Sequence, residues 1–169
     1  MADKMIVVVF GLPGSGKSYF AQRLAKKLKA VYISSDAVRK REFGQEDYSL
    51  RAKRAVYKRM VEIGKEARNR KRKVIFDGTF YLENIRKMIT ESFKSDTEIY
   101  FIEVHAPEEL IKERTGRKRA DSDADFEVYK KIKRSFQQMK TPHLKLASSD
   151  ENLEDNIQKA IAHLNTSES

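Results

Sequence analysis

The residues with the clearest chemistry are Gly11 to Ser18, which read GLPGSGKS and fit the pattern G-x-x-x-x-G-K-[ST] of a phosphate-binding loop. They stand in the context that this pattern requires, between an apolar run at residues 5–10 and a helical pattern that begins near Lys17. Glycine at the first, fourth and sixth positions lets the backbone turn tightly enough for several N–H groups to point at one phosphate. The loop therefore predicts a site for a nucleoside triphosphate.

Two side chains of this loop have roles of their own. Lys17 supplies a mobile ammonium to the β- and γ-phosphates, and Ser18 offers a hydroxyl to Mg²⁺. The positive end of the following helix adds to the attraction for phosphate. We therefore expect ATP and Mg²⁺ as cofactors, with Lys17 also serving in catalysis. The residues expected to bind them are Gly11, Pro13, Gly14, Ser15, Gly16, Lys17 and Ser18.

Asp36 and Arg39 come just after the second predicted strand, residues 31–33. In an open parallel sheet, ligands bind beyond the carboxyl ends of the strands. Asp36 could there accept the proton of an attacking hydroxyl, and Arg39, one helical turn on, could hold an anionic part of the acceptor. The alternative is purely structural: one of Ser34, Ser35 and Asp36 caps a short helix, and Asp36 pairs with Arg39.

The third predicted strand, residues 73–77, ends in Asp77, Gly78 and Thr79. A single carboxylate after a hydrophobic run is expected near Mg²⁺ or its waters, so we assign Asp77 to the metal and place Asp77 and Thr79 with Arg39 on the substrate side. No second acidic residue follows Asp77 to activate water, which favours transfer to an acceptor over hydrolysis. The alternative is an Asp in a simple turn before Gly78.

A stretch rich in arginine, residues 114–123, lies between two predicted helices. Phosphoryl transfer through a loose transition state places charge on equatorial oxygens, which an arginine about 4 Å away could stabilise. The stretch resembles a closing lid over about residues 114–124, in which Arg114 and Arg117 are catalytic candidates. A solvated basic loop is the alternative.

The elements that must position these residues alternate between strand and helix along the whole chain. The first strand is a continuous β-branched run, as in a parallel strand buried on both faces. We therefore predict an α/β fold with five mostly parallel strands and helices on both faces. Strands are expected at 5–10, 31–33, 73–77, 98–104 and 144–147, and helices at 17–29, 36–44, 49–70, 83–93, 107–114, 125–140 and 153–164.

Chain length and composition limit the number of domains, the chemistry of the site and the cellular location that we expect. A length of 169 residues predicts one domain, over residues 1–164, with a frayed tail at 165–169. The sequence has no cysteine, which excludes disulfides, thiolate zinc sites and a cysteine nucleophile. The longest early apolar run has six residues, too few for a membrane span, so we expect a cytoplasmic protein without a membrane partner.

The net charge of +10 is concentrated in one region, because residues 51–73 carry eleven Lys or Arg against only Glu62 and Glu66. A local cationic face suits an anionic partner, although a solvated helix face would look the same. The helix leads into the third strand and so ends at the sheet edge opposite the site. Arg51, Lys53 and Arg54 at its start could hold a polyanionic acceptor, whereas residues 70–73 should not reach the reacting group.

The chain resembles a known family over roughly Met5 to Met139. The segments that carry the resemblance are GLPGSGKS, SSDAVRKREFG, VIFDGTF and ERTGRKRADSDADFEVY. They are similar to the small P-loop kinases grouped with polynucleotide 5′-kinases, zeta-toxin-like kinases and related predicted kinases.

The resemblance implies particular roles. The family's Asp-x-x-Arg gives a general base and an acceptor-phosphate ligand, which correspond to Asp36 and Arg39. The lid arginine corresponds to Arg117, with Arg114 as the alternative. Phe80 replaces an Asn that the family often has after the third strand, which implies a different acceptor specificity; Phe80 and Tyr81 could stack on a ring or, more commonly, pack in the core.

The sequence thus predicts an ATP- and Mg²⁺-dependent kinase that phosphorylates a hydroxyl acceptor. The acceptor is either a 5′-hydroxyl of RNA or DNA, or a small metabolite such as a sugar or nucleoside derivative. An alternative of another class is a nucleotide-dependent module that binds nucleic acid without turnover.

Overall fold

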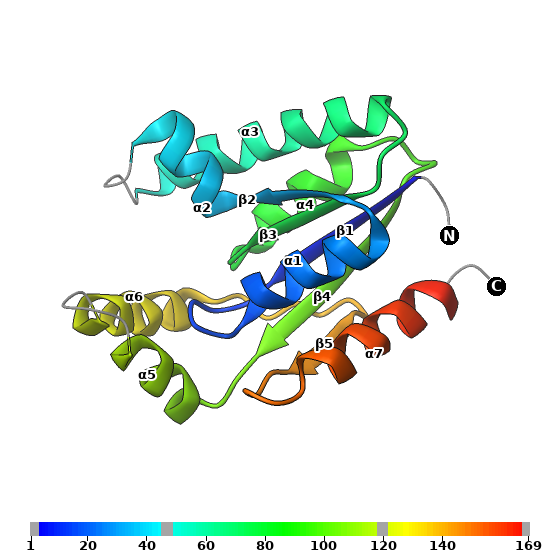
Figure 1. The fold of residues 1–169 in the computed structure, drawn as a ribbon. Coiled ribbons are helices and arrows are strands. Elements are labelled where there is room, and N and C mark those ends of the chain that lie inside the picture. The colour runs from blue at the N-terminus through cyan, green and yellow to red at the C-terminus, as the bar shows by residue number, and fades with distance from the viewer. Residues whose placement is uncertain (1–3, 45–48, 118–121, 167–169) are drawn as a thin grey trace.

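A computed structural model describes residues 4–44, 49–117 and 122–166, without the side chains of 122–125. Five parallel strands form one sheet in the order β2-β3-β1-β4-β5, with helices on both faces (Figure 1). The strands are β1 (Met5–Phe10), β2 (Val31–Ser34), β3 (Val74–Gly78), β4 (Glu98–His105) and β5 (Leu144–Ala147). The helices are α1 (Lys17–Leu28), α2 (Ser35–Val38), the π-helical η1 (Arg39–Phe43), α3 (Leu50–Asn69), α4 (Glu83–Ser92), α5 (Glu108–Gly116), α6 (Ser122–Ser135) and α7 (Leu153–Thr166).

The central strand β1 divides the core into two parts. All six of its residues are buried, and their side chains alternate between the faces because the strand has a period of two. One face, with Ile6, Val8 and Phe10, packs under α3 and α4, and the other face packs under α1 and α7. The uninterrupted apolar run in the sequence therefore predicted the position of this strand correctly.

The carboxyl ends of the strands meet at one edge of the sheet. Phe10 lies opposite Gly78 of β3 and Glu103 of β4, so the segment after β1 emerges beside the segments after both neighbours. The phosphate-loop sequence, Asp36 and Asp77 are consequently brought together from three separate parts of the chain.

The end of α6 differs from the sequence prediction. The helix ends at Ser135 and not at Lys140, and residues 136–140 have no regular secondary structure. Phe136 stacks on Phe10 with ring centroids 6.4 Å apart, and the Gln137 backbone N–H donates to the Tyr81 carbonyl at 2.9 Å. These tertiary contacts replace the helical hydrogen bonds that the apolar spacing predicted.

Three other boundaries also differ. Helix α5 continues to Gly116, so Arg114 is helical, and α6 begins at Ser122; residues 118–121 of the expected lid lie outside the described residues. Helix α7 continues to Thr166, which shortens the expected tail, and 167–169 are likewise not described. In the described part of the chain, no helix combines the length and the apolar character needed to cross a membrane.

Candidate active site

A cleft of about 550 Å³ lies at the carboxyl edge of the strands. Helix α2 and the start of α3 lie on one side of this edge, and α5 and α6 lie on the other (Figure 1). Many of the residues that the sequence singled out line the cleft, among them Pro13, Gly14, Lys17, Ser18, Asp36, Arg39, Asp77 and Thr79. Lining residues from other parts of the chain are Ser34, Ser35, Lys53, Tyr57, Gly78, Tyr81, Thr115, Val128, Lys131, Ile132 and Ser135.

The loop from Gly11 to Ser18 has the backbone that its glycines predicted. Gly14 and Gly16 have φ angles of 78° and 90°, values that favour glycine. At Gly11 the constraint is close packing, since an added Cβ would lie 2.2 Å from the Val104 carbonyl oxygen. Gly16 is the N-cap of α1, so the first turn of this helix, which contains the cleft residues Lys17 and Ser18, begins with backbone N–H groups that have no helical partner.

Not every residue of the loop faces this cleft. Gly11 and Ser15 line a separate cavity of about 190 Å³ beside Glu103 and Ile111. Pro13, Gly14, Lys17 and Ser18 face the main cleft, and we call them the loop side.

Helix α2 positions Asp36 and Arg39. Ser34 is its N-cap, and the Ser34 hydroxyl accepts from the Ala37 N–H at 3.3 Å, so Asp36 is not the capping residue. The Arg39 guanidinium donates to Asp36 Oδ1 at 3.3 Å, as the spacing of three residues predicted. The Asp36 side chain is 76% exposed and lines the cleft, whereas the Arg39 side chain is only 11% exposed. Asp36 is thus accessible to a ligand while Arg39 is held in place.

Asp77 has one oxygen in use and one without a partner. The Tyr32 hydroxyl, from the neighbouring strand β2, donates to Asp77 Oδ2. Asp77 Oδ1 is buried and has no hydrogen-bond partner among the described residues. A buried carboxylate oxygen normally has a hydrogen-bond partner or a metal ion as its ligand, so a cation or a water bound to it would complete the surroundings of Oδ1. Carboxylate and hydroxyl oxygens suit Mg²⁺, so Asp77 and Ser18 fit the metal that the loop implies.

Tyr32 remains a hydrogen-bond donor over the whole physiological range. Burial is the main cause that raises the pKa of Tyr32 to about 12, and the hydrogen bond to Asp77 raises it further. The phenol is therefore neutral at ordinary pH and fixes the orientation of the carboxylate.

Thr79 and the aromatic residues after β3 form a packed group. Tyr57 of α3 and Thr79 share a hydrogen bond of 3.1 Å between their hydroxyls, and the Phe80 N–H donates to the same tyrosine oxygen at 3.3 Å. Burial raises the pKa of Tyr57. Phe80 is buried and packs on Tyr57 with ring centroids 4.7 Å apart, so it packs in the core, the more common of the two alternatives that the sequence left open. Its φ of 40° is unusual for a non-glycine residue.

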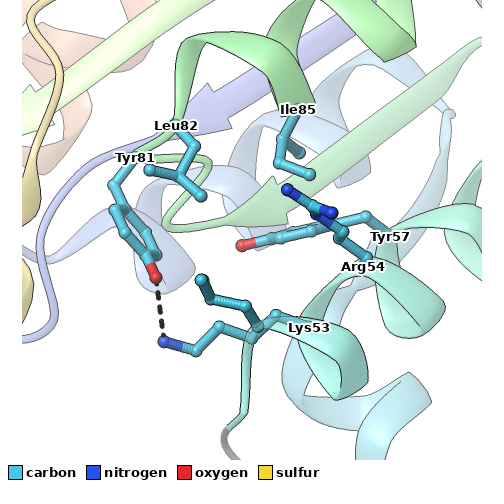
Figure 2. Close-up of a pocket in the computed structure, with 7 residues that line it drawn as sticks. Lys53, Arg54, Tyr57, Tyr81, Leu82 and Ile85 are labelled. Carbon is cyan, nitrogen blue, oxygen red and sulfur yellow. Dashed lines mark hydrogen bonds between the residues drawn. The ribbon is translucent and has the colours of Figure 1, made fainter.

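Tyr81, the next residue, bonds to a residue of the cationic helix. Its hydroxyl accepts from Lys53 Nζ at 3.1 Å (Figure 2), and its ring is nearly buried. The sequence had singled out both residues, but it did not predict the hydrogen bond between them. We call Asp36, Arg39, Lys53, Tyr81 and Lys131 the cationic side of the cleft.

Sequence reasoning missed the contribution of α6. Val128, Lys131, Ile132 and Ser135 line the cleft from this helix. Their spacing of three and four residues is the signal that could have found them, since it places all four on one helical face.

The two candidate lid arginines are placed differently from each other. Arg114 donates to the Gly14 carbonyl and to Ser148 Oγ, both at 3.1 Å, and the Ser148 hydroxyl donates to the Ser15 carbonyl. Arg117 is exposed and pairs with Glu113. Neither arginine is among the described residues that line the cleft. In this structure Arg114 contacts the loop from outside the cleft, whereas the Arg117 side chain is exposed.

The far end of the cationic helix lies away from the cleft. Arg68 donates to the Arg72 carbonyl at 2.9 Å, and Arg72 donates to the Lys29 carbonyl at 3.4 Å. These arginines satisfy backbone oxygens near the amino ends of β2 and β3, opposite the cleft.

Comparison with known proteins places the chain in a family. Residues 6–139 match the model of a protein family described as an AAA domain (AAA_33). A UPF0200 protein of Sulfurisphaera tokodaii is 32% identical over 147 residues, which cover 79% of this chain and 77% of the relative. The chain therefore belongs to this AAA-domain family and is related to the UPF0200 proteins.

Solved kinase structures share the fold. The APS kinase CysC of Mycobacterium tuberculosis, in complex with AMPPNP and APS, has a TM-score of 0.78 at 18% identity, over 98% of this chain and 99% of that chain. A gluconokinase from Sinorhizobium meliloti 1021 has a TM-score of 0.67 at 18% identity, over 98% and 94% of the two chains. The fold is that of P-loop kinases, so the expected fold class is confirmed.

Proposed function

We propose that the protein is an ATP-dependent kinase that transfers the γ-phosphoryl group to a hydroxyl acceptor. The observation that carries this proposal is that the phosphate loop and the pair of Asp36 and Arg39 line one cleft. A phosphate loop alone would suit many nucleotide-binding proteins, whereas a carboxylate and an arginine across from it suit an incoming alcohol.

The loop side would hold the donor. The backbone N–H groups of the loop and the start of α1 cradle the phosphates, and Lys17 neutralises the β- and γ-phosphate charge. Ser18 and Asp77 would hold Mg²⁺, which when bound neutralises charge that develops on the phosphate oxygens. Tyr32 fixes the Asp77 carboxylate by donating to Oδ2, which leaves Oδ1 without a partner among the described residues.

The cationic side would hold the acceptor. The acceptor oxygen forms a bond to the γ-phosphorus, the bond from that phosphorus to the bridging oxygen breaks, and ADP leaves. The hydroxyl proton passes to the Asp36 carboxylate, and Arg39 and Thr79 position the acceptor. Asp36 suits this role because its carboxylate is accessible and is oriented by Arg39 at 3.3 Å.

The arginines after β4 would serve the transferring group in different ways. Arg117 borders the residues that we expect to form the lid, and its exposed side chain is available to close over the cleft. Arg114 keeps the loop in shape through the Gly14 carbonyl. We assign charge stabilisation to Arg117 and positioning of the loop to Arg114.

The acceptor that we favour is a polynucleotide 5′-hydroxyl. Arg51 and Arg54 are exposed at the start of α3, next to the cleft residue Lys53, where a phosphate backbone leaving the cleft would pass. A small sugar or nucleoside derivative is the second candidate, and a cleft of about 550 Å³ has room for it. Nucleic-acid binding without turnover is the third.

The experiment is transfer from labelled ATP to 5′-hydroxyl oligonucleotides and to a metabolite panel, with Asp36→Asn as the variant. We expect transfer to fall by about two orders of magnitude or more with ATP affinity retained, because the amide cannot take the proton. Asp155→Asn is the matched control, since Asp155 is also an exposed residue in the first turn of a helix. Full transfer by Asp36→Asn would refute the role of Asp36, and a complete absence of acceptor-dependent ADP release in the wild type would refute the kinase.

A further inference from the structure

The amino edge of the sheet carries a concentration of positive charge that the proposed transfer does not use. Helices α1 and α3 both run toward this edge, at the end of the molecule away from α5 and α6 (Figure 1). The turns that follow the two helices are joined, because Arg72 donates to the Lys29 carbonyl at 3.4 Å and the Val31 N–H donates to the Lys73 carbonyl at 2.8 Å. We call the basic residues of these two turns the turn patch: Lys29, Arg70, Lys71, Arg72 and Lys73.

The turns that end α1 and α3 share one backbone motif. In each, an N–H donates to the carbonyl five residues earlier, from Ala30 to Ala25 at 2.9 Å and from Arg72 to Ala67 at 3.0 Å. The residue before each donor is in the left-handed conformation, with a φ of 54° after α1 and 58° after α3. Glycine adopts this conformation most easily and is the usual residue at this position. Stability alone therefore favours glycine in both turns.

Lysine occupies both of these positions. Lys29 and Lys71 are two of only three non-glycine residues with a positive φ in the described part of the chain. A residue with a Cβ atom is strained in this conformation. The helix dipoles do not need the two charges, because the last turns of α1 and α3 already contain Lys26, Lys27 and Arg68. The two lysines thus add charge to the surface at a cost in stability, which a partner outside the chain would explain.

The charge of the turn patch is not neutralised by the described residues. No carboxylate among them lies within ion-pair distance of a residue of the patch. Asp96, at the same edge of the sheet, pairs with Lys4 at 2.7 Å, and Glu62 of α3 pairs with Arg59 at 3.1 Å. Four of the five patch residues are exposed, and Lys73 is partly exposed. The patch therefore attracts anions from solution.

The composition of the patch indicates which polyanion fits it. All five residues are Lys or Arg, and the exposed large hydrophobic residues that the structure describes lie in other segments: Tyr19, Phe43, Leu50 and Val128. Proteins that bind single strands add aromatic rings on which bases stack, and helices that lie on membranes insert apolar side chains. A double-stranded nucleic acid requires neither, because its backbones present about one negative charge per 1.7 Å of helix axis.

We propose that the turn patch is a docking surface for the phosphate backbone of a double-stranded nucleic acid. Arg70 and Arg72 bind phosphate oxygens in pairs, and the lysines bind them as point charges. Such contacts position a duplex without reading its sequence. The inference goes beyond the proposed kinase function and does not depend on it, because the patch lies at the edge of the sheet opposite Asp36 and the phosphate loop.

Fluorescence anisotropy with a labelled duplex RNA tests the docking surface. Both 5′ ends of the duplex carry phosphate, so it offers no 5′-hydroxyl to the cleft. The single strand of the same sequence and vesicles of phosphatidylserine and phosphatidylcholine are compared with it, the vesicles by sedimentation. We expect the duplex to bind more tightly than the single strand, with an affinity that falls steeply as the salt concentration rises.

The double variant Lys29→Gly/Lys71→Gly removes two charges and relieves the strain in both turns. We expect its affinity for the duplex to fall about tenfold, and the slope of log affinity against log salt to decrease by about two. Its Tm should equal or exceed that of the wild type, because glycine suits both positions. The matched control Lys58→Gln/Lys159→Gln removes the same charge from exposed residues outside the turns, and its affinity should change less than about twofold.

Arg70→Gln provides a second measurement, since it removes a charge from an exposed residue and leaves both left-handed positions unchanged. If Lys29→Gly/Lys71→Gly melts below the wild type, the affinity of Arg70→Gln decides: a loss supports the docking surface and an unchanged affinity overturns it.

Three other results would overturn the docking surface. They are no binding of the duplex by the wild type, equal affinity in Lys29→Gly/Lys71→Gly and its control, and patch-dependent binding of the single strand or the vesicles in preference to the duplex. Asp36→Asn should bind the duplex as the wild type does. A failure of phosphoryl transfer with patch-dependent binding would therefore count against the kinase and support the docking surface.

Discussion

The two sides of the cleft are built in different ways. The loop side presents backbone N–H groups that glycines and a helix start have shaped, and its shape is reinforced by Arg114 and Ser148 from outside. The cationic side presents side chains of α2, η1, α3 and α6 that meet across the cleft. The proposed donor site thus depends on a short continuous segment, whereas the proposed acceptor site depends on how distant segments pack.

Because the two sides are built differently, they should tolerate amino-acid substitutions to different degrees. A backbone cradle fails when one atom intrudes, because its shape cannot be adjusted locally. A site made of long flexible side chains loses affinity in steps as each charge is removed. Substitutions on the two sides should therefore differ in size and in which substrate they affect.

The largest effect is expected for Gly11→Ala. The new Cβ would lie 2.2 Å from the Val104 carbonyl oxygen, and neither of these two backbones can move without disturbing β1 or β4. We expect a loss of about 2–4 kcal/mol in the free energy of unfolding and at least a hundredfold loss of ATP affinity. Chemical denaturation and nucleotide titration measure the two quantities. Gly116→Ala is the control, since no atom lies within 4 Å of the added methyl; wild-type behaviour of Gly11→Ala would contradict the backbone argument.

The loop side could be predicted because the residues that determine its structure are close together in the sequence. The apolar run of β1, the spacing of three glycines and the lysine at the start of α1 all lie within fourteen residues of sequence, and the structure has them as expected. The alternation of strands and helices likewise predicted the five-stranded parallel sheet.

The contacts that complete the site were not predictable in this way. Tyr32 and Asp77 are 45 residues apart, Lys53 and Tyr81 are 28 apart, and Arg114 and Gly14 are 100 apart. Each pair meets only because the strand order and the path of the chain after α6 bring the partners together. The same tertiary contacts end α6 at Ser135, five residues before the apolar spacing suggested.

An intermediate effect is expected for Tyr32→Phe, at the junction of the two sides. The variant keeps the ring and removes the donor to Asp77 Oδ2, so the carboxylate is free to turn. We expect the Mg²⁺ concentration for half-maximal activity to rise about tenfold. This is the low end of the loss in metal affinity that follows when a residue hydrogen-bonded to a metal ligand is removed. Stabilisation of the ATP-bound protein by Mg²⁺ against heat should fall in parallel, which provides a readout apart from activity.

The pH dependence of this variant sharpens the test. Because the pKa of Tyr32 is raised to about 12, the phenol stays protonated well above neutral pH, and the effect of Tyr32→Phe should be equal at pH 7 and pH 9. Tyr19→Phe is the matched control, since Tyr19 is exposed and outside the cleft. An unchanged Mg²⁺ requirement in Tyr32→Phe would show that Asp77 does not need the hydrogen bond from Tyr32 to bind the metal.

The smallest effect is expected for Tyr81→Phe, on the cationic side. The substitution removes the hydroxyl that accepts from Lys53 but keeps the ring that lies 4.9 Å from the ammonium, so part of the attraction that fixes the lysine remains. We expect the KM for the hydroxyl acceptor to rise about two- to fivefold, with the KM for ATP and the kcat unchanged. Because the lysine keeps its charge, Tyr81→Phe should cost less than Lys53→Met; a larger loss, or a change in the KM for ATP, would mean that Tyr81 supports the loop side and that the two sides are not independent.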